Sequence, residues 1–158
     1  MRFSEREPRP GDVADLEAAE KLCFGDRWPA RFFAAELTAP GRFSRILVGP
    51  AGELGAYLFC VWQYLDLHVL KVAVLPQFRR QGLARRLMSG AENHVVENGG
   101  ETVTLEVRCS NEGAQDLYLA MGYQELGVRP GYYSDGEEAV IMTKYPHSAQ
   151  SRYYGSRS

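Results

Sequence analysis

The sequence contains no long hydrophobic run and only three cysteines. Its longest uninterrupted apolar stretch is Ala56–Trp62, far short of the roughly 20 residues that a membrane-spanning helix needs. Residues 1–8 lack the apolar segment of a secretory signal, so we expect a cytoplasmic protein with no membrane partner. Cys23, Cys60 and Cys109 are odd in number and share no CxxC spacing, which excludes a disulfide framework and predicts that no metal is bound.

A strong excess of charge of either sign is also missing. The 18 basic and 20 acidic residues leave a formal net charge of −2, whereas domains that bind nucleic acid directly are usually strongly basic. We therefore expect no direct nucleic-acid partner. At 158 residues the chain is long enough for one domain with its own core. We expect that domain at residues 1–146 and a flexible tail at residues 147–158, where Leu, Ile and Val are lacking.

In the first half of the chain, the spacing of apolar residues predicts two helices followed by strands. Helical spacing begins after Gly11-Asp12 and again near Pro29. Beyond them, β-branched and aromatic runs predict a hairpin of residues 45–49 and 54–64, and a central strand at residues 67–75.

The second half of the chain alternates helices and strands. Apolar residues at four-residue steps from Leu83 to Val95 predict a helix, which Gly99-Gly100 would end with a left-handed cap. Residues 102–108 alternate strictly, which predicts a strand with Glu106 on its polar side. The remaining elements that we expect are a helix begun by Ser110-Asn111 and ended by Gly122, a strand from Tyr123 and a strand at residues 139–145. This order predicts an α/β (α+β) fold with one parallel crossover in a mixed sheet.

The turn before the helix that begins at Leu83 has the features of an anion site. Gly82 and Ala84 let backbone amides turn toward one point, and the start of the helix adds the positive end of its dipole. Arg79 and Arg80 bring positive charge beside those amides. A pyrophosphate would suit this turn, and an ordinary strand-to-helix turn with solvent-facing arginines explains the residues equally well. Neither the Walker pattern nor the dinucleotide fingerprint is present.

The spacing of Arg79, Gly82 and Ala84 between a strand and a helix resembles the acetyl-CoA pyrophosphate loop of the GNAT superfamily of N-acetyltransferases. The resemblance implies a central mixed, mostly antiparallel sheet of six to seven strands with one splayed parallel pair, flanked by about four helices. It also implies acetyl-CoA as the co-substrate. The residues that would then bind acetyl-CoA are Val72, Ala73, Val74, Arg79, Arg80, Gln81, Gly82, Leu83, Ala84, Asn111 and Tyr118.

Two further segments, LEVRCSN at residues 105–111 and LYLAMGY at residues 117–123, resemble the RimI branch of that superfamily, the bacterial ribosomal-protein-alanine N-acetyltransferases. This resemblance implies acetyl transfer to a protein N-terminal α-amine, with an N-terminal alanine of a small-subunit ribosomal protein as acceptor. Lys71, where the branch commonly has Asn, and Cys109, where it has a small residue, are departures that leave the acceptor open. Lysine side chains, small-molecule amines and a non-catalytic acyl-CoA-binding module remain alternatives.

The resemblance assigns the two proton-transfer roles to Glu106 and Tyr118. An α-amino group titrates at about 7.7–8.0, so part of it is protonated at neutral pH and needs a base, which Glu106 would supply. For a strand glutamate in general, a surface carboxylate paired with Arg108 is the alternative. Tyr118 would protonate the departing thiolate, and a core tyrosine is its alternative.

Four other side chains are candidates for the acceptor side or for the chemistry. By the resemblance, Trp28, Tyr132 and Tyr133 line the acceptor groove together with Glu106; without it, they are aromatics that cover the edge of the sheet. His68 is either a structural histidine or an alternative base. We interpret Cys109 as a small buried residue, because no activating partner is near it in the sequence.

Overall fold

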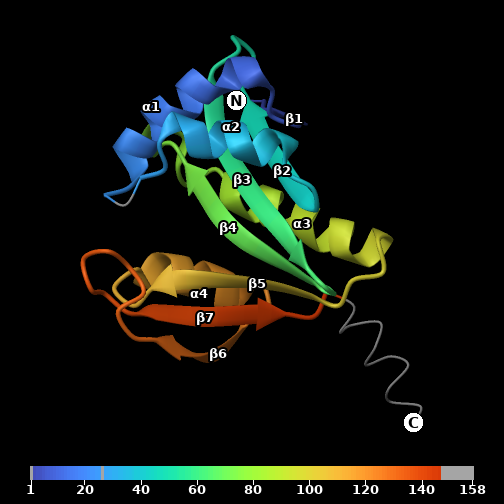
Figure 1. The fold of residues 1–158 in the computed structure, drawn as a ribbon, viewed down its shortest axis with the longest axis vertical. Helices are drawn as coiled ribbons and strands as arrows, with labels where there is room; N and C mark the ends of the chain where they lie inside the picture. The colour runs from blue at the N-terminus through green and yellow to red at the C-terminus, as the bar shows by residue number, and fades with distance from the viewer. Residues whose placement is uncertain (1, 26, 147–158) are drawn as a thin grey trace. The chain divides into compact units, whose positions relative to one another are not determined.

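The computed structural model describes residues 2–25 and 27–146, so the expected tail at residues 147–158 lies outside the described residues. Within them, seven strands form one mixed sheet in the order β1-β2-β3-β4-β5-β7-β6, with four α-helices (Figure 1). β4 and β5 pair in parallel, as the predicted crossover requires. The expected fold class is confirmed, whereas the splaying of the parallel pair stays a prediction.

The described residues group into two compact units, each made of two chain segments. Unit 1 holds residues up to Val61 and Val69–Met88, and unit 2 holds Trp62–His68 and the residues from Ser89 on. Three elements, β3 (Leu54–Gln63), β4 (Asp66–Val74) and α3 (Leu83–Glu97), have residues in both units. The single domain at residues 1–146 stays a prediction.

Unit 1 is built on the antiparallel hairpin of β2 (Arg42–Val48) and β3, as predicted from the sequence. α1 (Val13–Cys23) and α2 (Ala30–Thr38) pack against each other. The fully buried ring of Phe33 in α2 meets the ring of Phe59 in β3 at 5.3 Å between centroids. Aromatic packing between α2 and β3 therefore forms part of the core of unit 1.

The short strand β1 (Ser4–Arg6) was not predicted from the sequence. It pairs antiparallel with β2 at the edge of the sheet, and its three residues are Ser, Glu and Arg. Because an edge strand is held mainly by backbone hydrogen bonds, it needs no alternating apolar pattern, and the sequence showed none.

Unit 2 is built around β5 (Thr102–Arg108). Asp66–His68 of β4 pair with Thr102–Thr104 of β5, and β7 (Ala139–Lys144) pairs antiparallel with β5 and with β6 (Gln124–Arg129). Burial alternates along β5 as predicted, with Val103, Leu105 and Val107 in the core. The alternation places Glu106 on the opposite face of the strand.

The predicted helix boundaries of unit 2 are confirmed. Asn111 caps α4 (Glu112–Ala120), because its side-chain oxygen accepts the N–H of Ala114 at 3.1 Å. Gly99, with φ of +73°, follows α3, and the N–H of Gly100 bonds the carbonyl of Val95.

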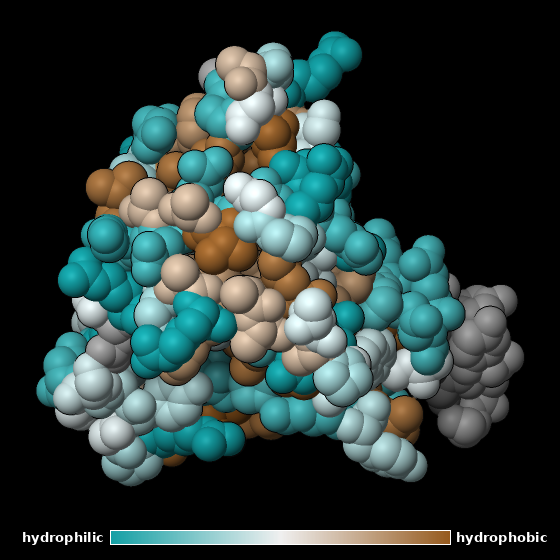
Figure 2. Space-filling model, turned by 45° about the horizontal axis from the view of Figure 1, so that its top comes forward, coloured by the Kyte–Doolittle hydropathy of each residue, from teal (hydrophilic) through white to brown (hydrophobic). Residues whose placement is uncertain are grey.

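Hydrophobic side chains on the face shown in Figure 2 gather in patches between hydrophilic ones. Exposed apolar residues in unit 1 include Leu22, Phe32 and Leu70. Among residues 2–25 and 27–146, no helix has both the length and the apolar character to cross a membrane.

Candidate active site

The turn predicted to bind an anion lies in unit 1, between a short 3-10 helix at Pro76–Phe78 and α3. Arg80 has φ of +65°, unusual for a residue with a side chain, and Gly82 has φ of +77°. Residues 79–82 are exposed. The first backbone hydrogen bond into the helix is the N–H of Arg86 to the carbonyl of Gly82, so the N–H groups of residues 83–85, in the first turn of α3, have no partner within the helix. Such a row of amides, flanked by Arg79 and Arg80, fits a diphosphate.

The end of β4 lies beside the same turn. Arg79 donates from Nε to the carbonyl oxygen of Val74 at 3.1 Å. Cys23 of α1 also approaches this carbonyl, with its Sγ 3.7 Å away. Burial raises the pKa of the Cys23 thiol, so the group is neutral at pH 7. The structure thus brings together two of the predicted acetyl-CoA contacts, Arg79 and Val74.

Glu106 occupies a buried polar cluster in unit 2. Its side chain is 5% exposed, and its Oε1 lies 2.8 Å from Nε2 of His68 and 3.2 Å from the hydroxyl of Tyr132, which donates to it. Its second oxygen, Oε2, is buried and has no hydrogen-bond partner among the described residues. Glu106 is therefore not the surface carboxylate of the alternative interpretation.

His68 lies at the edge of this cluster on β4, with Nδ1 3.3 Å from the side-chain oxygen of Gln63. The hydrogen bond to Glu106 raises the pKa of His68, and partial burial opposes that effect. The imidazole therefore keeps its proton to a higher pH than an ordinary histidine does. A protonated His68 forms an ion pair with Glu106, at 2.8 Å between Nε2 and Oε1.

Tyr118 lies on α4 with its ring in the core of unit 2. The side chain is nearly buried, and burial raises its pKa to about 12, so the hydroxyl is protonated at pH 7. Its ring meets that of Tyr123 edge to face at 5.7 Å. No hydrogen bond of its hydroxyl is found within the described residues, unlike the satisfied core tyrosine of the alternative interpretation. Nor does any hydrogen bond join Tyr118 to Glu106 there.

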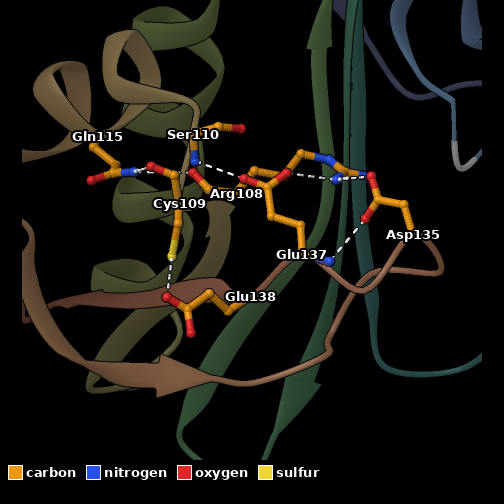
Figure 3. A network of polar contacts seen from close by, with 7 residues as sticks. All are labelled: Arg108, Cys109, Ser110, Gln115, Asp135, Glu137 and Glu138. Carbon is orange, nitrogen blue, oxygen red and sulfur yellow. Dashed lines mark hydrogen bonds and ion pairs between the residues drawn. The ribbon is translucent and has the colours of Figure 1, made fainter.

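The loop between β6 and β7 carries Tyr132 and Tyr133, with ring centroids 5.0 Å apart. Arg108 of β5 lies over the ring of Tyr133, 4.0 Å from its centroid. It also pairs with Asp135 at 2.9 Å and with Glu137 at 2.8 Å (Figure 3). Burial raises the pKa of Tyr133 to about 12. Arg108 thus holds the loop in place against β5, and this loop carries two of the residues predicted to line the acceptor groove.

Cys109 is not the buried residue that we expected. It is partly exposed, and its Sγ lies 3.5 Å from a carboxylate oxygen of Glu138 (Figure 3). Desolvation, and after it the neighbouring carboxylate of Glu138, raises the pKa of the thiol. Cys109 follows the last residue of β5. The alternation of buried and exposed side chains that buries Val107 therefore no longer applies to Cys109.

Trp28 lies in unit 1, in the connection between α1 and α2. Its indole meets the rings of Phe33 and Phe59, at 5.2 and 5.8 Å between centroids. Its backbone N–H donates to Oε2 of Glu20 at 2.9 Å. The position of this predicted acceptor residue is therefore held by a side chain of α1.

Glu20 was missed by the sequence interpretation although it is fully buried. Besides Trp28, it accepts the hydroxyl of Tyr57 at 2.6 Å and the ammonium of Lys71 at 3.0 Å. That ammonium also lies 4.0 Å from the ring centroid of Phe24. The available signal was an acidic residue four positions after Leu16, on the buried face of α1.

Comparison with known proteins identifies the relatives of this chain. Residues 11–123 match the family described as Acetyltransferase (GNAT) family. The chain is 30% identical to the ribosomal protein bS18-alanine N-acetyltransferase of Escherichia coli (strain K12), over 87% of this chain and 95% of that protein. It is 31% identical to an N-alpha-acetyltransferase of Sulfurisphaera tokodaii, over 87% of this chain and 89% of that protein.

Solved structures agree with these relationships. The crystal structure of the ribosomal-protein-S18-alanine N-acetyltransferase from Escherichia coli matches with a TM-score of 0.82 and 26% identity, covering 91% of this chain and 94% of that one. The fold is also that of Arabidopsis thaliana NAA60, solved in complex with acetyl-CoA, at a TM-score of 0.82 and 17% identity over 91% and 98% of the two chains.

Proposed function

Since this chain belongs to the acetyltransferase (GNAT) family and is an N-acetyltransferase, we propose that it acetylates the N-terminal α-amine of a protein, with acetyl-CoA as the donor. The acceptor that we propose is an N-terminal alanine of a small-subunit ribosomal protein. Two relatives that act, by name, on a ribosomal protein alanine or on N-alpha positions support this choice. The observation that carries the proposal is the buried, unpartnered Oε2 of Glu106.

In the proposed reaction, Glu106 acts as the general base. An ammonium cannot attack a carbonyl, so the acceptor must lose a proton, and Oε2 of Glu106 offers a lone pair that no described residue occupies. When bound, acetyl-CoA supplies the thioester carbonyl that the neutral amine attacks. Oε1 stays hydrogen-bonded to His68 and Tyr132, so the carboxylate need not reorient to take the proton.

Tyr118 is the proposed general acid. Its phenol is protonated at neutral pH, and its hydroxyl has no hydrogen-bond partner within the described residues, so it can give its proton to the departing thiolate.

Asn111, besides capping α4, is the proposed contact of the pantetheine arm. The proposed donor-binding groups of unit 1 are the backbone of Val72–Val74 and the turn at residues 79–84.

A peptide panel tests the proposed function. We expect release of free thiol from acetyl-CoA with Ala-starting peptides, and mass spectrometry should place the acetyl group on the α-nitrogen. Ser- and Met-starting peptides and an α-blocked lysine peptide serve as comparisons. Acetylation confined to lysine side chains would refute the α-amine assignment. Binding of acetyl-CoA without thiol release with any amine would indicate a non-catalytic acyl-CoA-binding module.

Replacing Arg79 by alanine should raise the KM for acetyl-CoA by about 10–100-fold with little change in kcat. The reason is that a charge-assisted hydrogen bond to the diphosphate would be made equally in the ground and transition states. Initial-rate kinetics at varied acetyl-CoA check this expectation. Arg9→Ala, which removes an exposed arginine elsewhere in unit 1, serves as the control. A rise confined to the KM for the peptide would show that Arg79 binds the acceptor peptide and not acetyl-CoA.

A further inference from the structure

The two oxygens of the Glu106 carboxylate differ in their hydrogen bonding. Oε1 has two partners, Nε2 of His68 at 2.8 Å and the hydroxyl of Tyr132 at 3.2 Å. Oε2 is buried and has no hydrogen-bond partner among the described residues. Burying a polar oxygen without a hydrogen-bond partner costs folding free energy. Such an oxygen is therefore found only where the surrounding contacts hold the side chain in that position.

The geometry points to Tyr132 as a positioning residue for the general base. Its hydroxyl and His68 both hydrogen-bond Oε1 of Glu106, which leaves Oε2, without a partner among the described residues, to take a proton from the acceptor amine. This inference rests on the proposed function, and it adds a role to Tyr132 that lining the acceptor groove does not include. A tyrosine that only lines a groove needs its ring, whereas this role needs its hydroxyl.

Tyr132 can serve in this way because its loop is fastened to β5. Arg108 stands two residues after Glu106 on the same face of β5. It stacks on the ring of Tyr133, and it pairs with Asp135 and Glu137 of the same loop (Figure 3). Glu137 also accepts the backbone N–H of Ser110 at 2.8 Å and donates its own N–H to Asp135 at 3.0 Å. The strand that carries the base therefore also carries the anchor of the loop that orients it.

The charged and titratable groups around Glu106 come from three elements. β4 contributes His68 and Asp66, and β6 ends at Arg129, whose charge acts on both His68 and Tyr132. The loop contributes Tyr132 and Tyr133, and the Glu106 charge raises the pKa of each as a secondary effect after burial. Removing the Tyr132 hydroxyl breaks a hydrogen bond to Glu106 and leaves every charge near the carboxylate in place.

Tyr132→Phe tests the inference in the full-length protein. A hydrogen bond to the charged form of a carboxyl group lowers its pKa, so losing the bond should move the acid limb of the pH profile of kcat/KM upward by about 0.5–1 pH unit. We expect kcat to fall by roughly 3–10-fold near that limb, with an unchanged KM for acetyl-CoA. The matched control is Tyr145→Phe, which removes the hydroxyl of another exposed tyrosine, outside the cluster.

A readout that does not depend on turnover separates this inference from the proposed function. The carboxyl carbon of Glu106, followed by NMR during a pH titration, should titrate at higher pH in Tyr132→Phe than in the wild type. An unshifted titration and an unshifted acid limb, with a change only in the peptide KM, would show that Tyr132 contacts the acceptor alone and would overturn the inference. Absence of thiol release by the wild type would instead refute the proposed function and leave the NMR result to stand.

Discussion

Replacing Glu106 by glutamine should lower kcat by about 10²-fold or more, because it removes the proposed general base. Glutamine has nearly the same shape as glutamate and can still bond to His68 and Tyr132, so the loss should come from the missing basic lone pair and not from a disturbed fold. The turn at residues 79–84 is untouched, and acetyl-CoA affinity should barely change. Steady-state thiol release and calorimetry with acetyl-CoA measure the two effects separately.

The control for this substitution is Glu125→Gln, which neutralises an exposed carboxylate on β6. It should leave both kcat and acetyl-CoA affinity close to those of the wild type. Turnover by Glu106→Gln that equals the wild type from pH 6 to pH 9 would remove Glu106 from the mechanism. In that case His68, the other titratable group of the cluster, would be the base to test next.

Replacing Glu20 by alanine should destabilise the protein by about 3–5 kcal/mol, because it leaves a nearly buried cation without its partner. The side chain of Glu20 is 0% exposed and that of Lys71 is 10% exposed, so water cannot replace the lost carboxylate fully. The hydroxyl of Tyr57 and the N–H of Trp28 lose their acceptor in the same step. The melting temperature should fall by roughly 6–20 °C, measured by thermal and denaturant unfolding.

Two further variants make this prediction specific. Glu7→Ala removes an exposed carboxylate that lies 3.5 Å from Arg45, and it should change stability by less than about 1 kcal/mol. The double variant Glu20→Leu, Lys71→Met removes both buried charges and should recover much of the loss. A loss for Glu20→Ala as small as that for Glu7→Ala would mean that the buried pair is not needed for stability. If Glu20→Ala does not fold, the loss of stability is measured on Glu20→Gln instead.

Local sequence patterns predicted most of the helices and strands and part of the candidate site. The alternation of residues 102–108 placed Glu106 on the polar face of β5, and the short polar side chain of Asn111 predicted the start of α4. The spacing of Arg79, Gly82 and Ala84 predicted an anion-binding turn before α3. The predictions for β5 and α4 succeeded because each depends on residues only a few positions apart in the chain, whereas binding of an anion by the turn stays a prediction.

Contacts between distant residues could not be predicted in the same way. Glu106 lies 38 positions from His68 and 26 from Tyr132, and Glu20 lies 51 positions from Lys71. Which of these side chains meet depends on strand register and on which helix packs over which strand. The partial exposure of Cys109 was misjudged for a related reason, since its surroundings are set by the loop that returns before β7.

The amino-acid sequence by itself determined the order of the helices and of every strand except β1, the position of the turn before α3 and the face of β5 on which Glu106 lies. Hydrophobic periodicity and turn chemistry act over a few residues, so they can be recognised without any partner. Only the tertiary structure decided which oxygen of Glu106 is held and which is left free. That choice depends on the parallel register that sets His68 of β4 opposite Thr104 of β5, and on the clasp by which Arg108 holds the loop of Tyr132.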